Sequence, residues 1–175
     1  MLEQDRYTLY RRIQDFAVEQ LLWRVLYITH VMQEHPVCDA VENKLKSMME
    51  KAEMAILSSN SQEDARRFAQ VCKENNRLFI EYAKHVADHA DDCESIRRQW
   101  QESTAEMGKL LTRLNPDQTN WYAMLRHSDD LLQMVIRDYP SGKYNTLTDV
   151  TPLLQRLAAD MADYAAKGYL NRHNL

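Results

Sequence analysis

Residues 62–114 read QEDARRFAQVCKENNRLFIEYAKHVADHADDCESIRRQWQESTAEMGKLLTRL, and this stretch decides the fold. Steps of seven residues that start at Ala65 meet an apolar side chain at every position up to Leu114. A companion series from Phe68 to Leu110 keeps a spacing of three and four residues from the first. Apolar residues at this spacing keep one stripe of a helix turned toward a partner. The pattern predicts one unbroken helix over 62–114, roughly 80 Å long at 1.5 Å per residue.

Both ends of this predicted helix carry boundary signals. The polar run SSNS at 58–61 precedes it, and Ser61 followed by acidic residues is typical of an N-cap with a negatively charged first turn. Asn115 followed by Pro116 marks the start of another helix, because proline is well tolerated at the first helical position.

The rest of the chain predicts further helices. Thr151 and Pro152 are suited to open the last of them, and Gly168 is suited to close it. Short connections make antiparallel neighbours the default, so the flanking helices fold back along 62–114. We expect one all-α domain over residues 1–175, an elongated antiparallel bundle of about five helices with one very long central helix. The expected helices span 5–35, 37–58, 62–114, 117–139 and 152–167.

The composition agrees with a helical protein. The chain of 175 residues has 3 glycines and 4 prolines, whereas sheets and irregular loops need these residues at their turns. A net charge of −4 disfavours nucleic acid and anionic membranes as partners. The most apolar run, LLWRVLYI at 21–28, is interrupted by Arg24 and is too short to cross a bilayer.

The amino terminus and the cysteines predict a cytoplasmic location. The sequence MLEQDRYTLYRR carries charges where a secretion signal has its apolar segment. Cys38, Cys72 and Cys93 are widely spaced and form no Cys-x-x-Cys pair. This usage is typical of buried thiols in a reducing compartment.

A candidate metal site lies in the acidic stretch EYAKHVADHADDCE at 81–94, where His85 and His89 stand four residues apart. Histidines at this spacing share one helix face and can bind a single ion. Folding the predicted hairpins back on themselves brings His30 and His35 to the same level. These four histidines are therefore candidate ligands for a divalent metal, Zn or Fe.

His89 also has a purely structural interpretation, which the sequence favours. It occupies the predicted apolar stripe, beside Val86 and Cys93. Asn75 and Ser103 occupy equivalent polar positions in the same stripe. A polar residue in such a stripe commonly fixes the register or the number of partner helices. We therefore expect His89 to be buried between helices.

Known catalytic motifs are missing from the sequence. It has no Glu-x-x-His pair, which di-iron carboxylate bundles use. The stretch HVADH at 85–89 has valine where zinc proteases place their glutamate. Neither a glycine-flanked serine nucleophile nor a complete phosphate-binding loop occurs. These absences favour a protein without catalytic activity.

The second half of the predicted long helix would be covered by fewer helices than the first. We expect this thinner region to associate with a second copy of the chain or with another protein. Aromatic and methionine side chains are common anchors of such surfaces. The candidate interaction residues are Trp100, Met107, Trp121, Tyr122 and Met124.

Together these features predict a non-catalytic helical bundle that acts through protein–protein interaction, as an adaptor, regulator or assembly factor. This interpretation requires no cofactor. The alternative is a metal-binding bundle, redox-active or hydrolytic, in which the histidine cluster holds the divalent ion.

Overall fold

Helices form almost the whole of the described chain. The computed structural model describes residues 2–57, 61–116 and 118–172. Within these ranges every element is helical, which confirms the all-α class. None of the described helices is long and apolar enough to span a membrane. The elements are α1 (Leu2–Val31), α2 (Cys38–Leu57), α3 (Gln62–Ala87), α4 (Cys93–Leu114), α5 (Trp121–Asp138), the 3-10 helix η1 (Tyr139–Ser141) and α6 (Asn145–Arg172).

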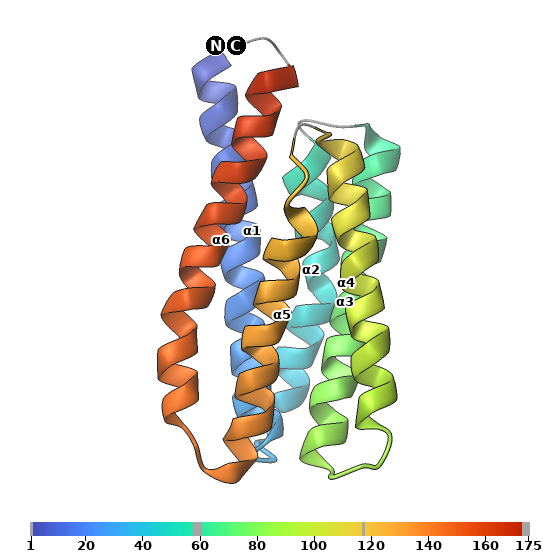
Figure 1. Ribbon diagram of the computed structural model, residues 1–175, viewed down its shortest axis with the longest axis vertical. Coiled ribbons are helices and arrows are strands. Elements are labelled where there is room, and N and C mark those ends of the chain that lie inside the picture. Colours follow the sequence, from blue (N-terminus) through green and yellow to red (C-terminus); the bar gives the residue numbers. More distant parts are fainter. Residues whose placement is uncertain (1, 58–60, 117, 173–175) are drawn as a thin grey trace.

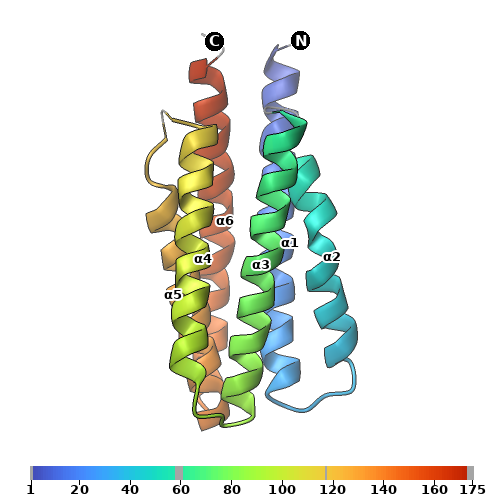
Figure 2. The same ribbon diagram turned by 90° about the vertical axis from the view of Figure 1, so that its right-hand side faces the viewer.

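The helices run alternately up and down one long axis, so the bundle is elongated (Figures 1 and 2). Each α-helix packs on the next one along the chain, and α6 packs back on α1, which closes the bundle. α1, α3 and α5 run in the same direction and also contact one another. These three helices therefore meet in the interior of the bundle.

The predicted unbroken helix over 62–114 is wrong. α3 ends at Ala87, α4 begins at Cys93, and the two helices pack against each other as an antiparallel hairpin (Figure 1). The connecting residues 88–92 read DHADD. Aspartate is a poor helix former because its side chain competes for backbone hydrogen bonds, so this acidic run favours a turn.

The turn at the end of α3 has a defined geometry. His89 adopts a left-handed backbone with φ of 53°. The N–H of Ala90 donates to the carbonyl of His85 at 2.9 Å, and the N–H of His89 donates to that of Val86 at 3.3 Å. This pair of hydrogen bonds is the Schellman motif, which ends a helix by satisfying its last carbonyls.

α1 ends with the same motif. Glu34 has φ of 49°, and the N–H of His35 donates to the carbonyl of His30 at 3.0 Å. The connections after α1 and after α3 lie at the same end of the bundle (Figure 1). Both turns are therefore made by a left-handed residue that carries a side chain.

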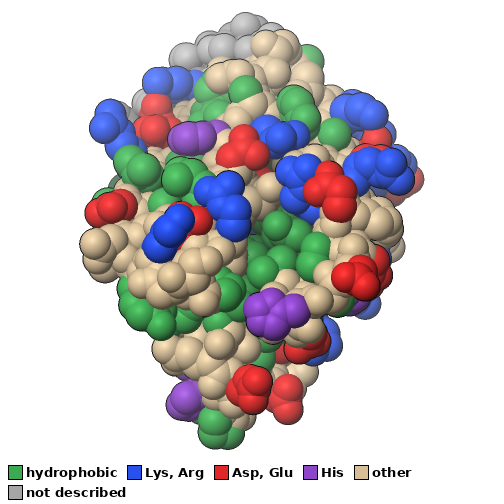
Figure 3. Space-filling model, turned by 60° about the horizontal axis from the view of Figure 1, so that its bottom comes forward, with side chains coloured by type: hydrophobic (Ala, Val, Ile, Leu, Met, Phe, Trp, Pro, Cys, Tyr) green, Lys and Arg blue, Asp and Glu red, His purple; other side chains and the backbone are tan. Residues whose placement is uncertain are grey.

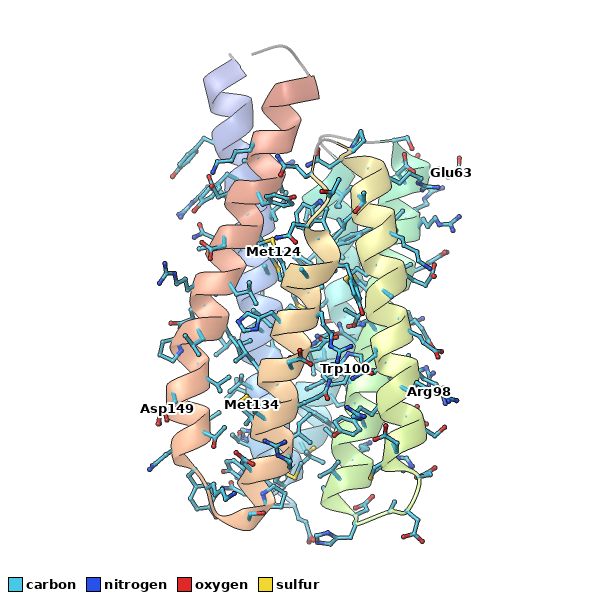
Figure 4. All side chains as sticks on the ribbon, in the orientation of Figure 1. Glu63, Arg98, Trp100, Met124, Met134 and Asp149 are labelled. Atoms are coloured by element: carbon cyan, nitrogen blue, oxygen red, sulfur yellow. The ribbon has the colours of Figure 1, made fainter. Side chains whose placement is uncertain are left out.

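The apolar stripe found in the sequence is buried on both sides of the turn. Phe79 in α3 and Trp100 in α4 are both 0% exposed. In Figure 4, Trp100 lies inside the bundle, whereas Glu63, Arg98 and Asp149 point outward. The buried stripe is interrupted at the turn of residues 88–92 and resumes in α4, because both helices of the hairpin face the same core.

The predicted burial of His89 is wrong, because this residue lies in the turn and its side chain is exposed. Its counterpart Asn75 does lie in the core and is 2% exposed. Ser103 is half-buried in α4. Of the three polar stripe positions, Asn75 is therefore the one that is fully enclosed.

One predicted helix boundary is confirmed and others are shifted. The side chain of Ser61 accepts a hydrogen bond from the N–H of Asp64 at 3.1 Å, which confirms the N-cap of α3. α5 begins at Trp121, later than predicted. α6 begins at Asn145 and passes through Pro152, so proline lies inside this helix and does not open it.

Two glycines allow close helix contacts. A Cβ atom on Gly108 of α4 would lie 3.0 Å from the Cα of Tyr122 in α5. A Cβ atom on Gly168 of α6 would lie 2.1 Å from the amide atoms of Asn115, the residue that ends α4. The absence of a side chain on Gly168 therefore lets the Asn115 amide lie flat against α6.

Candidate functional site

A buried arginine stands where the three parallel helices meet. Arg24 of α1 is 3% exposed. Its Nε and Nη2 donate to Oδ1 of Asn76 at 3.0 and 2.7 Å, and Nη2 also donates to Oδ1 of Asn75 at 2.5 Å. The guanidinium carbon lies 5.0 Å from the centre of the Phe79 ring, within the range of a cation–π contact. Burial lowers the pKa of Arg24 from its usual value, although Asp129 opposes this effect.

The two asparagines extend the network to neighbouring helices. Asn76 donates through Nδ2 to the carbonyl of Leu45 in α2 at 3.3 Å. Asn75 donates through Nδ2 to the hydroxyl of Thr104 in α4 at 2.9 Å. Since buried polar groups must be hydrogen-bonded to be tolerated, these contacts fix how α1, α2, α3 and α4 pack around Arg24.

Asp129 of α5 is the acidic member of the network and is 2% exposed. Its Oδ1 lies 3.7 Å from Nη1 of Arg24, and its Oδ2 accepts a hydrogen bond from the hydroxyl of Thr104. Burial raises the pKa of Asp129 to about 7, against the opposing effects of Arg24 and Thr104. The Asp129 carboxyl group therefore changes between its protonated and its ionised form near neutral pH.

A cavity of about 110 Å³ begins at this network. Its inner wall is formed by Arg24, Asn75, Thr104 and Asp129. Beyond them the lining is mainly apolar and comes from every α-helix of the bundle. It includes Phe16 and Leu21 of α1, Ile56 of α2, Phe68 of α3, Met107 and Leu111 of α4, Leu125 of α5, and Met161 and Ala165 of α6.

Three side chains of the cavity lining each have one buried polar atom without a hydrogen-bond partner. Gln20, Asn115 and Trp121 are 9%, 6% and 4% exposed. Oε1 of Gln20, Oδ1 of Asn115 and Nε1 of Trp121 are buried and have no hydrogen-bond partner among the described residues. A buried polar atom without a partner costs about 1–3 kcal/mol. These three atoms have almost no accessible surface, so they do not open into the cavity, although their residues belong to its lining.

The chemistry of the site favours binding. Cys72, the nearest thiol to the network, is 2% exposed, and burial raises its pKa to about 12. The thiolate is the nucleophilic form of cysteine, so Cys72 is unreactive at neutral pH. The remaining polar groups at the inner wall are amides, a hydroxyl, and an arginine paired with a carboxylate.

The four candidate metal ligands lie at the end of the bundle that carries the turns. His30 and His35 stack edge to face with ring centres 5.0 Å apart. Nε2 of His85 lies 3.3 Å from Oδ1 of Asp92, and the side chain of His89 is exposed. Among the described residues, no three His, Cys, Asp or Glu side chains come close enough to hold one metal ion. The structure thus brings His30 to His35 but does not assemble the predicted set of ligands.

The candidate interaction residues are mostly part of the chain's own interior. Trp100, Met107 and Trp121 are 0%, 5% and 4% exposed, and Met124 is half-buried against the core. Tyr122 is 45% exposed. Of the five, Tyr122 is the residue that offers substantial surface to a partner.

Sequence reasoning missed the members of the network as a site. One signal was present, because Arg24 interrupts the apolar run at 21–28. A second was the adjacent pair Asn75 and Asn76, one of which falls in the apolar stripe. Asp129 lies beside Asp130 in a helix with many polar residues, so its burial had no comparable signal.

No protein-family model, no curated protein and no solved structure matches the chain.

Proposed function

We propose that this protein is a non-catalytic binding protein that takes up a small, mainly apolar molecule in its central cavity. The observation that supports the proposal is a mainly apolar cavity of about 110 Å³ whose lining includes the buried polar network of Arg24, Asn75, Thr104 and Asp129. Ligand sites are typically concave and apolar with a few well-placed polar groups. Bundle interiors are a common place for such sites.

The size and lining of the cavity favour an organic ligand over water. Its volume of about 110 Å³ far exceeds the space that one water molecule needs. Water requires two to four polar partners, and cavities lined by aliphatic and aromatic side chains stay dry or bind apolar molecules such as benzene. Most lining residues here are of this kind.

The buried network gives the cavity a fixed inner wall. Arg24 is held by two asparagines, and Asp129 is held by Thr104. Side chains fixed by several hydrogen bonds lose little further entropy when a ligand binds, which favours affinity. The pocket is therefore preorganised at the end where polar recognition is concentrated.

Titration with toluene tests the proposal. We expect saturable binding of toluene, followed by chemical-shift changes in two-dimensional NMR spectra of the full chain. Ala165→Leu places a larger side chain in the cavity wall and should abolish binding. Ala123→Leu adds the same atoms on the exposed face of α5 and should leave binding unchanged. The proposal fails if toluene does not bind, or if Ala165→Leu binds it as the wild type does.

The adaptor or regulator role predicted from the sequence stays part of the proposal. Large exposed hydrophobic side chains, which support it, include Leu22 of α1, Met54 of α2 and Tyr122 of α5. Figure 3 views the molecule with the end that carries the α1–α2 and α3–α4 turns brought forward. On this face, hydrophobic side chains are exposed among side chains of both charges. Pull-down with the toluene-bound and the free protein compares the partners of the two states.

The predicted cytoplasmic location also stays a proposal. The cysteines Cys38, Cys72 and Cys93 are free thiols, as expected in a reducing compartment. Metal binding stays a prediction as well, and elemental analysis of protein purified without a histidine tag tests it directly.

A further inference from the structure

The buried pair of Arg24 and Asp129 leaves one polar atom of each side chain unused. Nε and Nη2 of Arg24 donate to the amide oxygens of Asn75 and Asn76, and Oδ2 of Asp129 accepts from Thr104. Nη1 of Arg24 and Oδ1 of Asp129 have no hydrogen-bond partner among the described residues and lie 3.7 Å apart. This separation is too long for a hydrogen bond, so a gap lies between the two atoms.

The gap belongs to the cavity. Arg24 and Asp129 both line the cavity, and each side chain is 4% exposed. The enclosed polar atoms that lack a partner include neither Nη1 nor Oδ1, so both atoms retain accessible surface. Their roles do not depend on the orientation of an amide, because a guanidinium nitrogen only donates and a carboxylate oxygen only accepts. A molecule in the cavity therefore meets one donor and one acceptor of known identity.

The width of the gap selects the shape of the group that can bridge it. A single oxygen about 2.8 Å from both atoms would bond them at an angle of about 80°, narrower than the tetrahedral angle that its proton and lone pairs prefer. The oxygen and nitrogen of a primary carboxamide lie about 2.3 Å apart, given its bond lengths. Hydrogen bonds of about 2.9 Å from this pair span the gap with a tilt of about 15° each. A planar acceptor–donor pair therefore fits better than a hydroxyl or a water molecule.

The charges at the gap favour a neutral group. Arg24 and Asp129 form an ion pair, so their charges balance. A carboxylate has no proton for Oδ1 of Asp129, and an ammonium group has no acceptor for Nη1 of Arg24. Either ion would also add an uncompensated charge to an enclosed site, where desolvation is expensive. A carboxamide makes both contacts and leaves the charge balance unchanged.

We propose that the cavity binds a small primary carboxamide or lactam, whose carbonyl oxygen accepts from Nη1 of Arg24 and whose N–H donates to Oδ1 of Asp129. The apolar body of the ligand lies against the aliphatic and aromatic lining. A trans secondary amide cannot make both contacts, because its N–H and C=O point to opposite sides. The inference rests on the proposed binding function and adds the chemical class of the ligand.

Four probes with the same branched alkyl body test the head group in the wild-type chain. Isobutyramide, methyl isopropyl ketone and isobutyrate share one shape and are smaller than toluene, and N-methylisobutyramide adds one methyl group. Dissociation constants are measured at neutral pH by NMR titration of the full chain. We expect isobutyramide to bind about tenfold more tightly than the ketone, which lacks the N–H and so loses a hydrogen bond to a charged group. N-methylisobutyramide and isobutyrate should bind no more tightly than the ketone.

A double variant assigns the preference to the buried pair. Arg24→Met with Asp129→Leu removes both charges together, and replacing a whole buried ion pair with apolar side chains is often neutral or stabilising. The preference for isobutyramide over the ketone should fall to about one- to twofold, with toluene affinity retained. The matched control, Arg126→Met with Asp130→Leu, makes the same changes in an ion pair of α5 whose side chains are 37% and 51% exposed. This control should keep the wild-type preference.

The outcomes are distinguishable. If neither toluene nor any of the four probes binds, the proposed function fails together with this inference. Binding of toluene without a preference for isobutyramide over the ketone overturns the inference alone. Binding of N-methylisobutyramide or isobutyrate as tightly as isobutyramide does the same. These comparisons need only the wild type, so they decide the matter even if the double variant does not fold. A preference that survives in the folded double variant also overturns the inference, because the head group then lies elsewhere.

Discussion

At the scale of single residues, Arg24 binds three buried side chains, those of Asn75, Asn76 and Asp129. Replacing it with methionine keeps much of the side-chain volume. It leaves the amide oxygens of Asn75 and Asn76 without this donor and Asp129 without its ion-pair partner. Removing one member of a buried ion pair costs about 3–5 kcal/mol. We expect Arg24→Met to lower the free energy of unfolding by about this amount in urea denaturation.

The matched control is Arg98→Met in α4. The Arg98 side chain is 73% exposed and lies 3.8 Å from Glu102. Exposed ion pairs contribute about 0–1 kcal/mol, so this variant should unfold almost as the wild type does. Equal losses in both variants would contradict a structural role for the buried network.

Asp129 predicts a pH dependence of stability. Its pKa rises from 3.8 to about 7 on folding, mainly through burial. The folded state therefore holds the proton more tightly than the unfolded state does. The contribution of this proton to the free energy of unfolding is fully present below the unfolded pKa of 3.8 and is lost as the pH rises through the folded pKa of about 7. The free energy of unfolding should therefore fall as the pH rises from 3.8 to about 7.

Asp129→Asn tests this titration because asparagine does not ionise. We expect the wild type to lose more stability than the variant between about pH 5 and about pH 8, as measured by urea denaturation at each pH. Arg24, Thr104 and the charged neighbours Arg126 and Asp130 on α5 are common to both proteins. The same pH slope in the two proteins would contradict a raised pKa for Asp129.

At this scale the sequence predicts burial better than it predicts partners. The seven-residue steps identified core residues such as Cys72 and Phe79 correctly, because burial follows from helical periodicity, whereas Trp100 was assigned to a partner surface and is buried. The contacts of Arg24 with Asn75 and Asp129 join helices far apart in the chain, and no local pattern encodes them. The cavity was missed for the same reason.

Among the elements, the α3–α4 turn depends on a left-handed residue with a side chain. Histidine at a φ of 53° carries a steric cost that glycine avoids. We expect His89→Gly to raise the free energy of unfolding by about 1 kcal/mol in urea denaturation. Glu34→Gly, at the equivalent position after α1, should act in the same direction because its φ is 49°.

A helical position supplies the opposite control. Glu102 is exposed within α4, and glycine in a helix interior costs about 1 kcal/mol. Glu102→Gly should therefore destabilise the chain while His89→Gly stabilises it. Destabilisation by all three substitutions would show that the left-handed turns do not limit stability.

The contact of α6 with the end of α4 predicts a second effect. Gly168→Ala places a methyl group 2.1 Å from the amide of Asn115, a distance that atoms do not tolerate. We expect a loss of stability of about 1–3 kcal/mol, typical of overpacking. Combining it with Asn115→Ala should recover part of the loss, because that change removes the clashing amide. Additive losses in a double-mutant cycle would contradict the contact.

The error about helix length has a physical cause. The apolar stripe reports which face of a segment is buried, and both helices of a hairpin can share that face. Residues 88–92 contain neither glycine nor proline, the usual markers of a break. Their aspartates favour a turn. Whether residues 62–114 form one continuous helix or an antiparallel hairpin depends on whether the two halves can pack on a common core. That choice is made by tertiary packing.

For the whole molecule, the sequence predicts the fold class but does not predict how the bundle closes. Scarce glycine and proline, helical periodicity and boundary signals predicted an all-α bundle, which the structure confirms. The pairing of α1 with α6 joins opposite ends of the chain, and short connections do not predict it. This pairing completes the wall around the cavity, so the candidate site could not be derived without it.

The order of packing around the closed bundle sets a folding sequence. Contacts between consecutive helices join residues that are close in sequence, so these contacts form rapidly. The contacts of α6 with α1 join the two ends of the chain, so they are expected to form later. We expect Ala162→Gly in α6 to accelerate unfolding with little change in the folding rate, and Ala83→Gly in the α3–α4 hairpin to slow folding. Both alanines are 0% exposed, and stopped-flow kinetics measures both rates. The reverse assignment would mean that the two ends of the chain meet first and the hairpin docks onto them.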